Sequence, residues 1–297
     1  MLLLPVSAAM DALAFCTGDI VGEHLRIDSR FAEGAFAEVY LAHDCRTSRR
    51  LVVKATKRTA FENFKRRCGS RMSVYSEFIT LYEMCHPHVV SVYDALVLPT
   101  HVAICMEHLD GPTLLESASA TLCDEIYMVL VTVDVLAALE YVHSLGISHR
   151  DVKPENIVTS CAALPVTSAK LIDFGLACAC TLEHGCRTEC GTFVYTAPEV
   201  RRGESYGYAV DMWALGVLVY ACLSGELPAC SSLSSCPKVS LDGPSCLVDD
   251  CSCPHNLSRD AERFVLCLLR HTPSQRLTST SARAHVWLHK RAPVFSP

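Results

Sequence analysis

The sequence predicts an α+β protein in which a small antiparallel sheet lobe precedes a larger, mainly helical lobe. Three observations favour this fold class. Residues 25–54 alternate between apolar and polar side chains, as half-buried strands do. Beyond residue 122 the apolar residues recur at helical spacing instead. A short polar break at 108–112 separates the two patterns and predicts a hinge, which is typical of a sheet followed by helices.

The strands are expected to come first along the chain. The alternating stretch breaks at Glu33-Gly34 and again at the basic turn 46–50, which predicts three antiparallel strands within 25–54. Two further strands are expected at 90–97 and 101–106.

The helices are expected mainly in the second lobe. Apolar spacing of three and four predicts a helix over 73–85, which His86-Pro87 ends. The same spacing predicts four later helices, over 123–144, 209–223, 258–270 and 279–288.

Composition excludes several classes of protein. Half of the 297 residues are apolar and 20% are charged, which excludes a disordered chain. The net charge of −6 predicts no nucleic-acid partner. The two longest apolar stretches contain Asp134, Glu140 and Asp211, which favour buried core helices over membrane spans. We therefore expect no association with a membrane.

The 18 cysteines bear on the cellular compartment. Several lie inside apolar runs, among them Cys105, Cys222 and Cys267, which indicates small buried side chains in a reducing environment. The sequence has no C-x-x-C pair, which argues against common zinc and thioredoxin-type sites. The N-terminal apolar run lacks the basic residues of a signal peptide. A cytoplasmic or nuclear protein that is not secreted is expected.

Two segments have an unusual composition. Residues 45–71 hold ten Lys or Arg and one acid, Glu62. A solvated basic face is the simpler interpretation, and a docking site for an acidic or phosphorylated partner is the alternative. Residues 229–256 are rich in Cys and Ser and predict a surface insert, with a zinc site at Cys251-x-Cys253-x-His255 or redox regulation as alternatives.

The most specific motif is His149-Arg150-Asp151-Val152-Lys153-Pro154-Glu155-Asn156. It is followed by Asp173-Phe174-Gly175, then by Gly191-Thr192, Tyr195 and Ala197-Pro198-Glu199. This ordered set resembles the eukaryotic-type serine/threonine protein kinase family, over roughly residues 24–292. The resemblance implies a bilobal protein kinase fold. It also implies transfer of the γ-phosphoryl group of ATP, with Mg²⁺, to serine or threonine of protein substrates.

The resemblance also implies catalytic and metal-binding roles. Asp151 would accept or orient the substrate hydroxyl, and Lys153 would reach the transferred phosphoryl group. Asn156 and Asp173 would bind Mg²⁺ through oxygen atoms. Lys54, at the end of Leu51-Val52-Val53-Lys54, would hold the α- and β-phosphates. Its partner would be Glu77, nine residues before His86-Pro87, with Glu83 as the competitor. Lys153 and Thr192 favour serine or threonine as the acceptor.

The implied nucleotide-binding set is less complete. The glycine-rich loop of the family maps onto residues 32–39, where only Gly34 remains, with Val39 at its end. Val52 would cover the adenine, and Met106 would be the gatekeeper. The backbones of Glu107 and Leu109 would pair with the adenine edge, and Val158 completes the expected nucleotide site. The degenerate loop and Val52 leave one alternative, a pseudokinase that acts as a scaffold or binding module.

The resemblance sets the expected organisation. An N-terminal extension (1–23) precedes a kinase domain (24–292) and a tail (293–297). The domain divides into an N-lobe (24–106), a hinge (107–112) and a C-lobe (113–292) that carries the insert 229–256. The replaced segment after residue 228 is typical of a divergent or virus-encoded member.

A regulatory site is also expected. Thr188 lies eleven residues before Glu199, where related kinases carry an activating phosphothreonine. Arg150 is its expected phosphate partner, because guanidinium groups pair well with phosphate. The alternative is an ordinary loop threonine.

Overall fold

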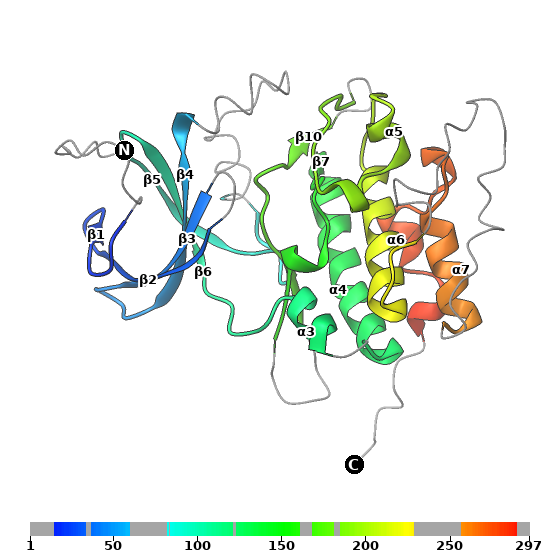
Figure 1. Ribbon diagram of the computed structural model, residues 1–297, viewed down its shortest axis with the longest axis horizontal. Coiled ribbons are helices and arrows are strands. Elements are labelled where there is room, and N and C mark those ends of the chain that lie inside the picture. Colours follow the sequence, from blue (N-terminus) through cyan, green and yellow to red (C-terminus); the bar gives the residue numbers. More distant parts are fainter. Residues whose placement is uncertain are drawn as a thin grey trace, which may run out of the picture. The chain divides into compact units, whose positions relative to one another are not determined.

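The computed structural model describes residues 15–33, 37–59, 82, 84–120, 123–160, 168–180, 185–228 and 257–289. The chain divides into two compact units, Met1–Leu109 and Asp110–Pro297. Figure 1 shows a sheet in the first unit and mainly helices in the second. The α+β class expected from the sequence is therefore confirmed.

The N-terminal unit is built on one six-stranded antiparallel sheet, in the order β1-β2-β3-β4-β6-β5. Strands β2, β3 and β4 confirm the three strands expected within 25–54, and β5 and β6 confirm the two that follow. The strands are β1 (Ile20–Val21), β2 (Leu25–Glu33), β3 (Ala37–Asp44), β4 (Arg50–Lys57), β5 (Val92–Val97) and β6 (His101–Glu107).

Alternation along these strands gives the sheet two different faces. One face is the core of the unit and includes the buried side chains of Tyr40, Val53 and Cys105. Directly paired residues point to the same face, and successive residues point to opposite faces. The pairing Val39↔Lys54↔Ile104 therefore lies on the face opposite the Tyr40 core.

The C-terminal unit is mainly helical, and its core lies along α4 and α6 (Figure 1). Helix α4 is apolar and long enough to cross a membrane by composition and length. However, it packs against α6, α8 and β9, so it is a core helix of this unit. The helices are α3 (Leu114–Ala120), α4 (Glu125–Ser144), α5 (Pro198–Arg201), α6 (Ala209–Ser224), α7 (Arg259–Leu268) and α8 (Ser279–Ala282).

Two small sheets position the loop that carries the most specific motif. Strand β7 (Ile147–Ser148) pairs with β10 (Cys178–Ala179), and β8 (Ile157–Thr159) pairs with β9 (Ala169–Leu171). Residues 149–156 connect β7 to β8. Both ends of this loop are therefore held by antiparallel pairing.

The prediction of a single helix over 279–288 is wrong. Helix α8 ends at Ala282, and Val286–His289 form a separate 3-10 turn. The Trp287 N–H donates to Nδ1 of His285 at 3.2 Å, and the buried Trp287 indole donates to Oε1 of Glu125 at 3.0 Å. These contacts outweigh the helical periodicity. Most of the helix expected over 73–85 and all of the insert 229–256 lie outside the described residues.

Candidate active site

His149 fixes the backbone at the start of the loop. Its imidazole is fully buried, and its edge meets the ring of Phe174 at a centroid distance of 4.6 Å. Nε2 lies 3.0 Å from the Ile172 carbonyl, which can only accept, so Nε2 carries the hydrogen. Nδ1 then accepts the Asp151 N–H at 3.3 Å. Burial lowers the pKa of His149, which favours this neutral form.

Asp211, in the first turn of α6, accepts hydrogen bonds from the same loop. Oδ1 accepts the Arg150 N–H at 2.7 Å. Oδ2 accepts three donors, from the His149 N–H, the Ser148 hydroxyl and His143 Nε2, at 2.8 to 2.9 Å. Burial alone would raise the pKa of Asp211, but the hydrogen bond and charge of His143 bring it below its usual value. Asp211 is thus an ionised acceptor that fixes three consecutive residues of the chain.

The Asp151 carboxylate lies within a cluster of four side chains. Oδ1 accepts the N–H and the hydroxyl of Thr192 at 3.1 and 3.0 Å. Oδ2 accepts from Asn156 Nδ2 at 3.0 Å and pairs with Lys153 Nζ at 2.8 Å. Lys153 Nζ also donates to the Thr192 hydroxyl at 2.9 Å. The structure thus brings together two predicted catalytic residues, Asp151 and Lys153, with the predicted metal ligand Asn156.

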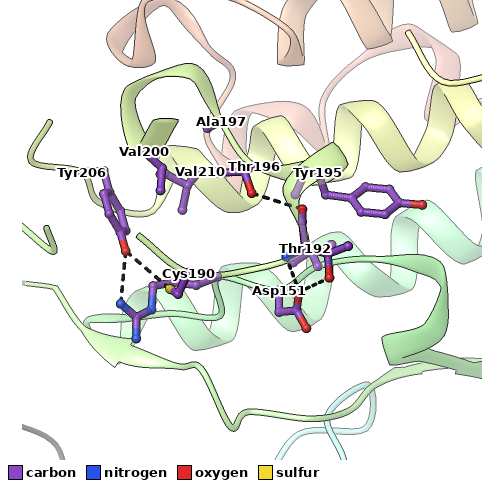
Figure 2. Close-up of a pocket in the computed structure, with 12 residues that line it drawn as sticks. Asp151, Cys190, Thr192, Tyr195, Thr196, Ala197, Val200, Tyr206 and Val210 are labelled. Carbon is purple, nitrogen blue, oxygen red and sulfur yellow. Dashed lines mark hydrogen bonds between the residues drawn. The ribbon is translucent and has the colours of Figure 1, made fainter. Parts of the chain in front are cut away.

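A glycine lets Thr192 approach Asp151. Gly191 has φ +95°, a conformation that side-chain-bearing residues rarely adopt, and a Cβ there would lie 2.7 Å from the Arg150 carbonyl oxygen. The segment 191–192 therefore passes against the catalytic loop. Figure 2 shows Thr192 and Asp151 facing each other beside a small cavity that Cys190, Tyr195 and Tyr206 also line.

Asn156 and Asp173 lie at one end of the β8-β9 pair. Ile157 pairs with Leu171, and the Ile172 N–H donates to the Asn156 carbonyl at 2.9 Å. Asp173 is exposed and has φ +59°. The register therefore places Asn156, just before β8, close in the fold to Asp173, just after β9.

These two residues fit Mg²⁺ chemically. Nδ2 of Asn156 donates to the Asp151 carbonyl at 2.8 Å and to its carboxylate, which leaves Oδ1 without a hydrogen bond in the described part of the chain. Among the described residues, no three His, Cys, Asp or Glu form a metal cage. Mg²⁺ is commonly held by one or two protein oxygens together with phosphates, so this sparse set suits it.

The predicted nucleotide residues of the N-terminal unit share one sheet face. Val52 pairs with Met106, and Lys54 pairs with Val39, so all four lie opposite the Tyr40 core. The Glu107 N–H and carboxylate both contact the backbone of Ser91.

Three other predicted nucleotide residues are placed less fully. Leu109 is half-buried at the end of the N-terminal unit, and Val158 lies on β8 of the C-terminal unit. Gly34, like Glu77, lies outside the described residues.

Arg150 has partners that the sequence did not reveal. The backbone of Arg150 has φ +67°. Its guanidinium donates to the Leu176 carbonyl at 2.5 Å and to the Tyr206 hydroxyl at 3.1 Å. The Tyr206 hydroxyl donates in turn to the Thr188 carbonyl at 2.5 Å. Tyr206 therefore connects the two residues predicted to be regulatory. No sequence motif marked this contact, which spans 56 positions from Arg150 to Tyr206.

The basic stretch 45–71 is described only up to residue 59. Within that part, Arg46 pairs with Asp44, and Arg49 lies over the ring of Tyr93 at 4.0 Å. Two of its cations thus already contact groups of the fold. The expected docking role stays a prediction.

Comparison with known proteins identifies similar sequences. A family model described as "Protein kinase domain" matches residues 26–288. Calcium/calmodulin-dependent protein kinase type 1B of Homo sapiens is 34% identical over 275 residues, which cover 88% of this chain and 74% of that protein. The SNF1-related protein kinase catalytic subunit alpha KIN12 of Arabidopsis thaliana is 29% identical over 91% of this chain and 52% of its own.

A third relative is the serine/threonine-protein kinase RAD53 of Saccharomyces cerevisiae. It is 31% identical over 99% of this chain and 36% of its own length. These three relatives come from an animal, a plant and a fungus. They give no support to the virus-encoded origin expected from the sequence.

Proposed function

This chain belongs to the protein kinase family, as a domain homologous to serine/threonine kinases, and we propose that Asp151 is the centre of its phosphoryl transfer to protein hydroxyls. The observation that carries this proposal is the cluster around the Asp151 carboxylate. Lys153, Asn156 and Thr192 hold both of its oxygens in defined directions. A carboxylate that is fixed before the substrate binds can orient a hydroxyl with little reorganisation.

Each neighbour of Asp151 has a distinct proposed role. Asp151 accepts the hydrogen of the substrate hydroxyl and holds its oxygen ready for attack. Lys153, 2.8 Å from Asp151, stabilises negative charge on the transferred group. Asn156 and Asp173 would hold Mg²⁺, which supplies positive charge to the phosphates. Lys54, Val39, Val52 and Met106 would bind ATP together with Gly34, Glu107, Leu109 and Val158, and Glu77 would pair with Lys54.

The test compares wild type with Asp151→Asn in a peptide phosphorylation assay with labelled ATP and Mg²⁺. Asparagine keeps the shape but is a poor hydrogen acceptor, so we expect kcat to fall about 10²- to 10⁴-fold with little change in thermal unfolding. Asp28→Asn removes an exposed carboxylate elsewhere and serves as the control. Labelled products should contain phosphoserine or phosphothreonine.

Two outcomes would contradict the proposal. Equal activity in wild type and Asp151→Asn would favour the pseudokinase that serves as a scaffold or binding module. Mainly phosphotyrosine in the products would overturn the serine/threonine assignment, which rests on Lys153 and Thr192.

We also propose that phosphorylation of Thr188 regulates this site. A doubly charged phosphate on Thr188 would attract the Arg150 guanidinium, which already connects to the Thr188 backbone through Tyr206. We expect Thr188→Ala and phosphatase-treated enzyme to lose kcat/KM relative to phosphorylated wild type. Equal values in all three samples would remove Thr188 as a switch.

The remaining expectations complete the proposal. The domain bounds 24–292, a docking partner at 45–71 and a cytoplasmic or nuclear location are proposed on the sequence grounds given above.

A further inference from the structure

Two thiols of the segment after Asp173 lie in contact. Sγ of Cys180 is 3.0 Å from Sγ of Cys186, about one ångström longer than a disulfide bond of about 2.05 Å. Both cysteines are buried, with exposed fractions of 3% and 7%. The activity proposed above uses neither thiol.

The backbone on both sides of this contact is already fixed. The Cys180 N–H donates to the Gly146 carbonyl at 2.8 Å, and the Cys180 carbonyl accepts the Tyr208 hydroxyl at 2.5 Å. Cys186 exchanges two backbone hydrogen bonds with Tyr206, at 2.8 and 2.9 Å. The backbone of Cys180 is therefore held by residues before and after the segment, and the backbone of Cys186 is held by Tyr206.

We propose that Cys180 and Cys186 are an oxidation site, where a peroxide converts the two thiols into a disulfide. The bond would close the chain over residues 180–186 and covalently connect the end of β10, which pairs with β7 at the start of the catalytic loop, to the segment that pairs with Tyr206. Tyr206 also accepts a hydrogen bond from Arg150 of the catalytic loop, so the cross-link would restrict a residue that contacts this loop.

The reaction balances with one molecule of hydrogen peroxide. The Cys180 thiolate attacks one peroxide oxygen, the O–O bond breaks, and hydroxide leaves and takes up the released thiol proton as water. The Cys186 sulfur then attacks the Cys180 sulfenic acid, the S–O bond breaks, and the departing hydroxide takes the Cys186 proton as a second water. Two thiols are oxidised and one peroxide is reduced.

The electrostatics favour Cys180 as the attacking thiol. The hydrogen bond from Cys186 lowers the pKa of Cys180, although burial and the charges of Cys178 and Asp211 act to raise it; the Arg150 guanidinium also lowers this pKa. The pKa of Cys178 is raised, first by its hydrogen bond with Cys186 and then by burial. Cys178 also contacts Cys186, but its raised pKa leaves less of the reactive thiolate, so we expect Cys180 to react first.

Zinc is a weaker assignment for the same thiols. Across the described ranges, no group of three or more His, Cys, Asp or Glu has an arrangement that fits a metal ion. A structural zinc site needs four ligands in tetrahedral order. Two thiols at 3.0 Å need only a short approach of their sulfur atoms to form a disulfide.

The experiment uses the full reduced chain treated with a small excess of hydrogen peroxide, then alkylated and digested without reduction. Glu183 lies between the two cysteines in the sequence, so cleavage there separates them unless a disulfide holds the fragments together. We expect the joined fragments in wild type and in the matched control Cys178→Ser. We expect their loss in Cys180→Ser and Cys186→Ser, and after addition of a thiol reductant.

The thermal unfolding midpoint is a second readout that does not depend on kinase activity. Peroxide should raise it by roughly 4 °C in wild type relative to Cys186→Ser, because the cross-link restricts the unfolded chain. The proposal is overturned if wild type gives no joined fragments while the exposed Cys45 is oxidised. Joined fragments at an undiminished yield in Cys180→Ser, or a lowered midpoint in oxidised wild type, would also overturn it.

Discussion

At the scale of single residues, the site concentrates unusual backbone conformations beside its charged groups. Arg150 and Asp173 have φ +67° and +59°, which costs a non-glycine residue on the order of 1–2 kcal/mol. Hydrogen bonds offset part of this cost. The Arg150 N–H donates to Asp211, and the Asp173 carboxylate accepts the Gly175 N–H at 3.1 Å. The fold therefore sustains strain at Arg150, next to the proposed catalytic Asp151, and at Asp173, a proposed metal ligand.

Tyr206 is a positioning residue whose loss should be visible in kinetics. Tyr206→Phe removes one hydrogen bond from Arg150 and one from the Thr188 carbonyl, at a cost of about 1 kcal/mol each. We expect kcat to fall about five-fold with little change in KM for ATP. Tyr93→Phe, which removes a hydroxyl contact with Arg49 in the other unit, should leave kcat unchanged. An unaltered kcat in Tyr206→Phe would mean that the Leu176 carbonyl alone holds Arg150.

At the scale of elements, the approach of segment 191–192 to the catalytic loop depends on glycine. Gly191→Ala introduces both a left-handed strain and a Cβ 2.7 Å from the Arg150 carbonyl. Gly203→Ala is the matched control, because Gly203 has φ +68° and open space around its Cβ position. We expect Gly203→Ala to cost about 1 kcal/mol of stability without effect on kcat. Gly191→Ala should cost more and lower kcat at least ten-fold, because the loop that holds Asp151 must shift. Equal kinetics in the two variants would contradict this account.

Periodicity predicted the strands and helix α7 because one face of each is buried, and the apolar run of α6 predicted a helix that is buried on all sides. The strands within 25–54 and helices α4, α6 and α7 all follow such patterns. Helix α3 was missed, although its start carries a local signal. Thr113 and Glu116 exchange side-chain and backbone hydrogen bonds at 2.7 and 3.2 Å, a capping box of the form T-x-x-E. The break inside 279–288 had no local signal, because the Trp287 contact with Glu125 spans 162 positions.

At the scale of the whole molecule, the motifs predict candidate residues for the chemistry but not every residue that supports them. Asp151, Asn156 and Lys153 lie within six positions of the chain, so a short motif identifies them. Support that no motif predicted comes from Thr192 and Tyr206, which lie 41 positions from Asp151 and 56 positions from Arg150. Only the folded chain brings such distant residues into contact. Thr192 was assigned a role in acceptor choice, and the structure adds its two hydrogen bonds to Asp151.

Stability as a function of pH tests the histidines of the described residues together. Burial lowers the pKa of four of them, His101, His149, His271 and His285, below the ordinary value of about 6.5. Below that pH the unfolded chain binds protons that the folded chain does not bind. The free energy of unfolding must therefore fall as the pH decreases from about 6.5 toward the lowered folded values. Asp211, whose pKa is also lowered, adds its own loss only below about pH 4.

We expect urea unfolding to show a steady loss of stability between pH 7 and pH 5.5. His149 should be the largest single contributor, because its ring is fully buried beside Phe174. His149→Phe keeps a ring there but cannot bind a proton. The free energy of unfolding of this variant should be lower at every pH. Its slope against pH should be smaller than that of wild type, by at most about 1.4 kcal/mol per pH unit. A slope in His149→Phe equal to that of wild type would show that His149 is protonated in the folded state, against the neutral form that its contacts with Ile172 and Asp151 require.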